Sequence, residues 1–305
     1  MEIYLPIAEL SVNWLVMIGL GLAVGFLSGM FGVGGGFLMT PLLVFTGIPS
    51  TVAVATTLSH VTASSMSGAL TQWRKRAIDF PMAGVMLVGG LVGTLFGVWL
   101  FALMRRQGQM DFIVSVTYVL LLGTVGGIML RESLASLHAY RTGQAVRSRP
   151  ISHAWLHRLP LKMRFRQSRL YISVIPPVAI GFVVGALSAI MGIGGGFIIV
   201  PAMIYLLRMP TNVVMGTSLV QIICVTAVTT ILQATSNYAV DIILAGLLVI
   251  GGVVGAQLGV RAGAKLRGEQ IRFLLAVVVL TVCAGLLWGL VVRPADVYSL
   301  SLGAQ

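Results

Sequence analysis

The stretch Leu27-Ser28-Gly29-Met30-Phe31-Gly32-Val33-Gly34-Gly35-Gly36-Phe37 decides the fold, because the chain contains it twice. The second copy is Leu187-Ser188-Ala189-Ile190-Met191-Gly192-Ile193-Gly194-Gly195-Gly196-Phe197, displaced by 160 positions. Nine of the seventeen positions from Gly25 to Pro41 are identical to their partners in the second copy. A glycine-rich break between apolar helices leaves backbone N–H groups unpaired, and the helix that follows points its first N–H groups the same way. We therefore expect two anion-binding sites, formed by backbone N–H groups, that face each other.

Composition places the chain in a membrane. Of its 305 residues, 57% are hydrophobic and only 9% are charged, whereas a soluble domain carries about 25% charged residues. The formal net charge of +12 is interpreted as the cytoplasmic bias of a multi-pass membrane protein rather than as a nucleic-acid surface. We expect no nucleic-acid partner, no metal site and no cofactor. The two cysteines, Cys224 and Cys283, imply no disulfide framework.

Ten apolar runs follow one another, and most reach the length of about 20 residues that a crossing needs. They cover 14–31, 37–47, 52–73, 79–103, 111–130, 171–191, 197–208, 213–235, 241–262 and 270–292. The second and seventh hold only 11 and 12 residues, and each contains a proline. Short, Gly/Pro-interrupted segments at matching places in two halves indicate a transporter's binding site. The predicted fold is all-α and polytopic, with two inverted repeats of five helical segments and a short or re-entrant second segment in each. The alternative is two ordinary short spans.

The basic residues predict the domain organisation and the orientation. We expect a first transmembrane repeat at 1–130, a basic cytoplasmic linker at 131–170 and a second repeat at 171–305. With the N-terminus outside, 17 of the 20 Lys and Arg residues fall in inside loops, as the positive-inside rule requires. The chain is thus predicted to be embedded in the lipid bilayer of the plasma (inner) membrane, with both termini extracytoplasmic. The linker is interpreted as a topology signal, and the alternative is a docking surface or an electrostatic funnel for cytosolic anions.

Hydroxyl and amide side chains gather in the third and eighth runs. Such groups usually join helices in membranes, but several recur at matching positions in the two halves. Thr56 and His60 are four residues apart, as are Thr217 and Gln221, so each pair shares a helix face. These neutral donors and the glycine amides could replace the hydration shell of an oxyanion. The candidate substrate-binding residues are Gly34, Gly35, Gly36, Gly194, Gly195, Gly196, Ser28, Ser188, Thr56, Thr57, His60, Thr217, Ser218, Gln221, Gln72 and Gln233.

Few ionisable groups lie in the runs. Asp79 and Asp241 begin the fourth and ninth runs and are interpreted as helix N-terminal caps. No Lys, Arg, Asp or Glu lies in the middle of a run, and His60 is the only histidine there. It is either a proton-sensing or anion-contacting residue or a neutral bridge between helices. His153 and His157 lie in the linker without acidic or cysteine partners, which argues against a metal site. Two glycine series indicate close helix packing: Gly89, Gly93 and Gly97, and Gly251, Gly255 and Gly259.

The doubled motif Leu-Ser-x3-Gly-x-Gly-Gly-Gly-Phe-x3-Pro at 27–41 and 187–201 resembles the TauE/SafE sulfite exporter family. Further resemblance lies in Thr56-Thr57-Leu58 with Gly216-Thr217-Ser218-Leu219, and in Ile78-Asp79 with Val240-Asp241. It covers both halves, roughly 14–104 and 171–292. The resemblance implies transport of small sulfur-containing anions such as sulfite, sulfoacetate or other organosulfonates. The first half departs from the second at Ala55, where the repeat has Gly216, and at His60, where it has Gln221.

The predicted function is export of such an anion by alternating access around a site at the repeat interface. An inside-negative potential drives an anion outward by about 2.3 kcal/mol per charge per 100 mV, so export needs no coupling ion. A proton- or sodium-coupled organosulfonate importer is the alternative. An intramembrane enzyme is a more distant alternative, because Gly216-Thr217-Ser218 only loosely resembles an intramembrane serine protease and lacks the glycine after the serine. We therefore do not expect an enzyme.

Overall fold

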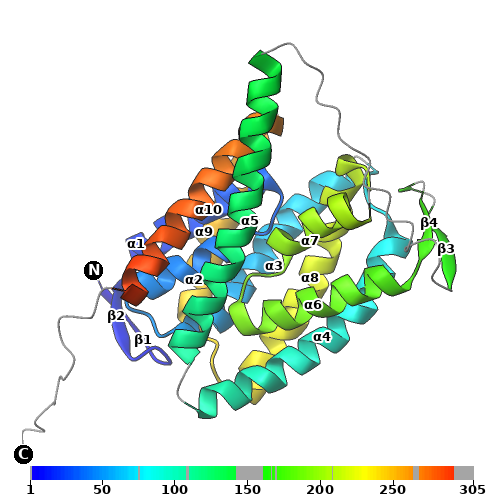
Figure 1. Cartoon of the computed structure of the whole chain (residues 1–305). Coiled ribbons are helices and arrows are strands. Elements are labelled where there is room, and N and C mark those ends of the chain that lie inside the picture. Colours follow the sequence, from blue (N-terminus) through cyan, green and yellow to red (C-terminus); the bar gives the residue numbers. More distant parts are fainter. Residues whose placement is uncertain are drawn as a thin grey trace, which may run out of the picture.

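The computed structural model describes residues 2–74, 76–107, 110–141, 161–165, 167–168, 170–207, 209–263 and 268–291. Helices dominate these residues (Figure 1). The first half consists of β1 (Glu2–Leu5), β2 (Leu10–Asn13), α1 (Trp14–Phe31), α2 (Gly36–Phe45), α3 (Ser50–Arg74), α4 (Phe80–Arg106) and α5 (Met110–Arg141). The second consists of β3 (Lys162–Phe165), β4 (Leu170–Ser173), α6 (Ile175–Met191), α7 (Gly196–Pro201), the π-helix η2 (Ala202–Leu206), α8 (Thr211–Ser236), α9 (Ile242–Gly263) and α10 (Gly268–Val291). The predicted all-α polytopic class is confirmed.

Six helical segments in the described part of the chain are long and apolar enough to cross a membrane. They are Trp14–Phe31, Phe80–Arg106, Phe112–Arg131, Val213–Ser236, Ile242–Gly263 and Phe273–Val291. Helix α3 has 25 residues but falls outside this set, because its many hydroxyl side chains lower its hydropathy. Helix α6 has 17 residues and is one residue shorter than α1.

The second helix of each half is short, as the sequence predicted. Helix α2 has 10 residues, and α7 has 6 before the backbone widens into the π-helix η2 after Pro201. Both helices start from a glycine in the left-handed region, Gly35 at φ 67° and Gly195 at φ 78°. The preceding helices α1 and α6 likewise end on left-handed glycines. Glycine adopts this conformation without steric cost, so the same sequence produces the same reversal twice. Whether α2 and α7 are re-entrant stays a prediction.

The two halves exchange packing partners. Helix α1 packs along α9, and its counterpart α6 packs along α4, the counterpart of α9. Helices α3 and α8 pack on each other, as do α5 and α10 (Figure 1). The two glycine series make the close contacts: a Cβ on Gly255 would collide with the Leu22 carbonyl of α1, and one on Gly93 with the Phe182 carbonyl of α6. The exchange of partners is the packing that the predicted repeat of two similar halves would give. Their opposite orientation across a bilayer stays a prediction.

Two β-hairpins precede α1 and α6, and the sequence analysis did not predict them. Strand β1 pairs with β2 from Glu2↔Asn13 to Leu5↔Leu10. Strand β3 pairs with β4 from Lys162↔Ser173 to Phe165↔Leu170, which is the same register displaced by 160 positions. The structural repeat therefore begins before the apolar runs. Part of the predicted linker at 131–170 belongs to α5 and to the second hairpin, and its residues 142–160, with His153 and His157, lie outside the described residues.

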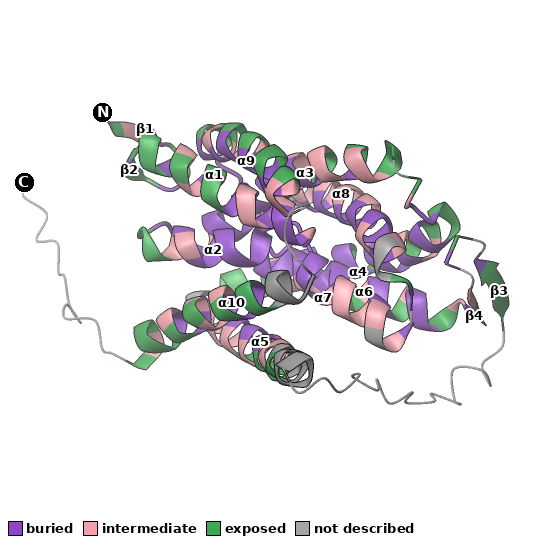
Figure 2. Cartoon of the chain, turned by 90° about the horizontal axis from the view of Figure 1, so that it is seen from above, coloured by how far each residue is buried: buried purple, intermediate pink, exposed green. Residues whose placement is uncertain are grey.

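Burial separates the central helices from the outer ones. Figure 2 shows buried residues concentrated in α2, α3, α7 and α8, while α1, α5, α9 and α10 carry exposed faces. Several exposed side chains are large and apolar, among them Trp99, Trp288 and Ile242. A soluble protein rarely exposes so much apolar surface, whereas a bilayer solvates it. The centre of the molecule is thus where polar side chains are kept from lipid.

Candidate functional site

The two glycine copies cross at the centre of the molecule. A Cβ on Gly36 would lie 2.5 Å from the carbonyl oxygen of Ile193, and a Cβ on Gly196 would collide with the carbonyl oxygen of Val33. Behind the crossing the rings of Phe37 and Phe197 stack. Six predicted residues are brought together here, namely Gly34, Gly35, Gly36, Gly194, Gly195 and Gly196. Only hydrogen fits between the two backbones at Gly36 and Gly196.

Helices α3 and α8 enclose the crossing with reciprocal side chains. Val61 of α3 approaches Gly194, and Ile222 of α8 approaches Gly34. The hydroxyls of Thr62 and Thr226 join the two helices at 2.7 Å. Ser65 lies 3.5 Å from the position of a Cβ on Gly34, and its buried hydroxyl has no hydrogen-bond partner in the described part of the chain. Neutral polar groups thus reach the glycine crossing from both halves.

Thr56 and Thr217 do not reach the glycine loops but connect the halves. The Thr217 hydroxyl accepts a hydrogen bond from the backbone N–H of Asp79 at 3.0 Å, and the Thr56 hydroxyl accepts one from the N–H of Asp241 at 3.1 Å. Both aspartates are buried, and their carboxylates accept from backbone N–H groups in the first turn of α4 and of α9. The capping role predicted for them agrees with this geometry.

Each aspartate also binds a hairpin of the opposite half. The second oxygen of Asp79 accepts from the backbone N–H and the hydroxyl of Ser168, at 2.9 and 2.6 Å. The second oxygen of Asp241 accepts from the backbone N–H of Ile7 at 3.1 Å. Sequence reasoning missed these partners because it did not predict the hairpins. The aspartates are therefore structural joints between halves.

His60 and Gln221 occupy equivalent places on different helices. The imidazole of His60 packs so tightly on Gly252 of α9 that a Cβ there would overlap the ring. The Gln221 amide packs on Gly90 of α4 and donates to the Met86 carbonyl at 3.4 Å. Both side chains are buried and pack on a glycine next to one of the two glycine series, Gly252 beside Gly251 and Gly90 beside Gly89. Neither imidazole nitrogen of His60 has a hydrogen-bond partner in the described part of the chain, so both roles considered for His60 stay predictions.

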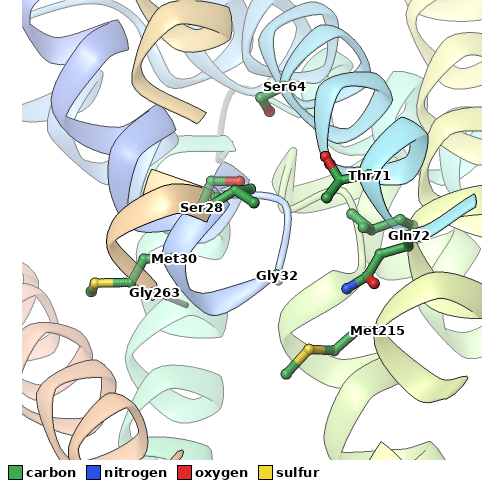
Figure 3. Close-up of a pocket in the computed structure, with 12 residues that line it drawn as sticks. Ser28, Met30, Gly32, Ser64, Thr71, Gln72, Met215 and Gly263 are labelled. Atoms are coloured by element: carbon green, nitrogen blue, oxygen red, sulfur yellow. The ribbon is translucent and has the colours of Figure 1, made fainter. Parts of the chain in front are cut away.

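Two further predicted residues line a cavity beside the first glycine loop. Ser28 and Gln72 contribute to a cavity of about 180 Å³. Figure 3 shows Thr71 and Gln72 of α3 on one side of it, the loop at Gly32 on the other, and Met215 of α8 below. The full lining is Ser28, Gly29, Met30, Gly32, Ser64, Gly68, Thr71, Gln72, Met215, Leu219, Val260 and Gly263.

The cavity combines neutral hydrogen-bonding groups with apolar walls. Ser28, Ser64, Thr71 and Gln72 provide the hydroxyls and an amide. The sequence analysis did not choose Ser64 and Thr71, although positions 64, 68, 71 and 72 recur at helical spacing and mark one face of α3. No Lys, Arg, Asp or Glu is among the residues that line the cavity in the described part of the chain. In that part, no group of three His, Cys, Asp or Glu side chains is placed to hold a metal ion.

The two residues of the second half that are equivalent to Ser28 and Gln72 have no exposed surface. Ser188 and Gln233 are fully buried, and the Gln233 amide donates to the Ala189 carbonyl at 3.1 Å. Of the remaining predicted residues, Thr57 of α3 is fully buried. The Ser218 hydroxyl donates to the Met215 carbonyl at 3.2 Å. The structure therefore places two of the sixteen candidates in the cavity and six at the glycine crossing next to it.

A polytopic helical protein with a small, neutral, donor-lined cavity at the meeting point of two similar halves belongs to the class of membrane transport proteins. The model of the sulfite exporter TauE/SafE family matches residues 17–286. The chain belongs to this family, as the resemblance in its motifs indicated.

Relatives agree with this class. The chain is 28% identical over 274 residues to a "Probable membrane transporter protein YjnA" of Bacillus subtilis, covering 89% of this chain and 97% of the relative. It is also 28% identical over 284 residues to a "Probable membrane transporter protein" of Xylella fastidiosa, covering 90% and 95%. A "Sulfite exporter TauE/SafE family protein 3" of Arabidopsis thaliana is 29% identical over 124 residues, 39% of this chain and 26% of the relative. No solved structure matches the chain.

Proposed function

We propose that this membrane transporter exports a small sulfur-containing anion, sulfite or an organosulfonate such as sulfoacetate, by alternating access. The observation that carries the proposal is the cavity of about 180 Å³ that ends on the first glycine loop, at the interface of the repeats. The Ser28 hydroxyl and the Gln72 amide can donate hydrogen bonds to the oxygens of the anion. The hydroxyls of Ser64 and Thr71 donate to the carbonyls of Val61 and Ser67, at 3.2 and 3.4 Å, and would have to turn away from them to bind it. The apolar wall of the cavity, formed by Met30, Met215 and Leu219, suits a carbon substituent.

Neutral donors suit an anion that must leave again. A buried ion pair would hold an anion tightly, and removing one charge of such a pair is strongly unfavourable. Hydrogen bonds to a charged group each contribute about 1.5–3 kcal/mol, so a few of them replace water without trapping the ion. The start of α2, where a helix favours an anion, follows the cavity-lining Gly32 in the chain.

The orientation predicted from the basic residues puts this cavity on the cytoplasmic side. Gln72 lies two residues before Arg74, and Gly263 follows the basic residue Arg261. An anion loaded from the cytoplasm then moves down the membrane potential by about 2.3 kcal/mol per charge per 100 mV. The membrane potential thus favours export.

The alternatives remain distinguishable. A proton- or sodium-coupled importer of organosulfonates would use a cation gradient to move the anion against the same potential. An enzyme would need a nucleophile beside a base, and in the structure Ser218 binds the Met215 carbonyl while His60 packs on α9. The relatives named as transporters also favour transport over catalysis.

The test begins with the purified chain in detergent. Thermal stability is measured with sulfite, sulfate, thiosulfate, sulfoacetate and taurine, and the account expects stabilisation by sulfite or a sulfonate. Proteoliposomes loaded with the stabilising anion are then given an inside-negative potential, which should accelerate efflux without any proton or sodium gradient. Flux that appears only with one of those cation gradients contradicts export and supports the importer.

A matched pair of variants ties the flux to the cavity. Thr71→Val removes a lining hydroxyl while keeping the side-chain shape, and should weaken anion binding about tenfold, as expected for one hydrogen bond to a charged group. Thr124→Val makes the same change on an exposed face of α5 and should leave binding unchanged. Equal binding in both variants would remove the cavity from the proposal.

A further inference from the structure

The two sides of the molecule differ although their residues correspond. Gln233 and Ala189 of the second half are joined by a hydrogen bond of 3.1 Å. The corresponding residues of the first half are Gln72 and Gly29, and both line the cavity. The contact between Gln233 and Ala189 is therefore formed, whereas Gln72 and Gly29 both line the open cavity.

A second pair of contacts shows the same difference. A Cβ on Gly192 would lie 2.6 Å from the carbonyl oxygen of Val54. Its counterpart Gly32 meets only the flexible side chain of Met215, at 3.8 Å, and Met215 stands at the position equivalent to Val54. The backbone of the second glycine loop is thus packed tightly against α3, while the first glycine loop is loosely covered by α8.

The difference is notable because other contacts between the halves are reciprocal. The two Thr–Asp hydrogen bonds are 3.0 and 3.1 Å long, the two hairpins share one register, and the α1–α9 and α4–α6 packings correspond. A nearly symmetric frame with an asymmetric pair of contacts is what one state of an alternating-access cycle gives. In the opposite state the two contacts would be exchanged.

The closed side is held by a small group of polar residues. Asn237 donates from its amide to the Gln233 side-chain oxygen at 2.5 Å, which leaves the Gln233 amide group directed at Ala189. The Arg105 guanidinium donates to the Asn237 backbone carbonyl. In the predicted orientation Arg105 lies on the extracytoplasmic side. We call Gln233, Asn237 and Ala189 the outer gate.

Ser188 gives independent support for an opening on that side. Its hydroxyl is fully buried and has no hydrogen-bond partner in the described residues, and an unpaired buried polar group is costly. Its counterpart Ser28 lines the cavity. A hydroxyl that is unpaired in one state would be solvated, or would contact the anion, once the outer gate opens.

We propose that Gln72 is the cytoplasmic gate residue: in the outward-facing state its amide donates to the Gly29 carbonyl, as Gln233 now donates to Ala189, and the two contacts alternate. This inference rests on the proposed function, since alternation is the means of transport. The segment that follows Gln72 is the basic Arg74-Lys75-Arg76, without an asparagine equivalent to Asn237. The gate residues position the helices and need not touch the anion.

The experiment follows a thiol in the cavity, in a background with Cys224→Ser and Cys283→Ser. Met215→Cys is labelled with a membrane-impermeant thiol reagent from the cytoplasmic face of inside-out vesicles. Gln233→Ala removes the outer gate, favours the outward-facing state and should slow labelling at least threefold. Gln72→Ala removes a contact of the outward-facing state only, which favours the inward-facing state, so labelling should become faster. Gln257→Ala on the exposed face of α9 is the matched control and should change nothing.

The opposite directions make the result decisive. Labelling that slows in both variants, or that is unchanged in Gln233→Ala, overturns the gate. If Gln233→Ala folds poorly, Asn237→Ala replaces it. This variant removes the hydrogen bond that orients the Gln233 side chain and should also slow labelling. Labelling needs no substrate. If the two variants shift the labelling rate in opposite directions but the chain transports no sulfur anion, the gate is supported and the proposed substrate is wrong. If the chain transports a sulfonate but the two variants do not shift the labelling rate in opposite directions, the proposed function is supported and the gate is wrong.

Discussion

The rings of Phe37 and Phe197 stack with centroids 4.8 Å apart and an interplanar angle of 20°. The two residues are equivalent members of the two halves, and each follows the glycine loop of its own half directly. Their contact fixes the starts of α2 and α7 against each other, so that two segments 160 positions apart in the sequence form one central structure. Changes at this crossing should therefore affect both halves.

The first prediction concerns the closest approach of the two loops. Gly36→Ala places a methyl group 2.5 Å from the Ile193 carbonyl oxygen, without any backbone strain from a left-handed conformation. We expect flux to be lost and the melting temperature to fall by several degrees. Gly84→Ala is the control, since a Cβ on Gly84 meets nothing within 4 Å. Unchanged flux in Gly36→Ala would show that the loops need not touch for transport.

The second prediction concerns backbone conformation inside the loops. Gly35→Val and Gly195→Val put a branched residue where φ is 67° and 78°, at a cost of about 1–2 kcal/mol for the left-handed conformation alone, and add clashes with Ser28 and Val184. We expect both variants to insert into the membrane but to carry no anion. Membrane fractionation and flux measure the two properties separately. Wild-type flux in both would exclude the loops from the mechanism.

The sequence predicted the helices well because apolar runs in membranes have few alternative structures. The ten runs correspond to the ten helices of the described chain, and the short second segment of each half was recognised from its proline and its length. The hairpins before α1 and α6 were not predicted. Four-residue strands such as Glu2–Leu5 carry too little periodicity to be distinguished from a loop, and their stability comes from partners such as Asp79 and Asp241 in the opposite half.

The candidate site was predicted in part. The glycine motif identified the crossing because its doubling was visible, and Ser28 belongs to that motif. Thr56 and Thr217 also recur, but recurrence marks any contact that two similar halves make reciprocally, and theirs joins helices. Ser64, Thr71 and Met215 line the cavity without similar counterparts in the other half. A search for repeated residues could not find them, because the equivalent positions of the other half hold Val225, Leu232 and Val54.

The third prediction concerns the joints between halves. Asp79→Asn keeps one acceptor oxygen for Met82 but turns the other into a donor that faces the Ser168 N–H. An unsatisfied buried group costs about 1–3 kcal/mol, so thermal stability should fall. Ser168→Ala alone should cost less, because the backbone N–H of Ser168 still binds Asp79. Equal stability of Asp79→Asn and the wild type would show that the hairpin does not hold α4.

The fourth prediction decides between the two roles of His60. His60→Gln introduces the residue that the second half has at the equivalent position, Gln221, where an amide is accommodated against a helical glycine. As a neutral bridge, His60 should be replaceable, so we expect flux to persist with the wild-type pH profile between about pH 6 and 8. A flux that loses its pH dependence in this variant would instead identify His60 as a proton-sensing group.

The central claim is that neutral groups beside the glycine crossing hold one anion during transport. The most direct measurement is an experimental structure of the chain with bound sulfoacetate. The account predicts the sulfonate in the cavity, within hydrogen-bond distance of Ser28, Thr71 or Gln72 and next to the loop at Gly32. A sulfonate bound far from both glycine loops, or a cavity filled by lipid while the anion binds elsewhere, would contradict it.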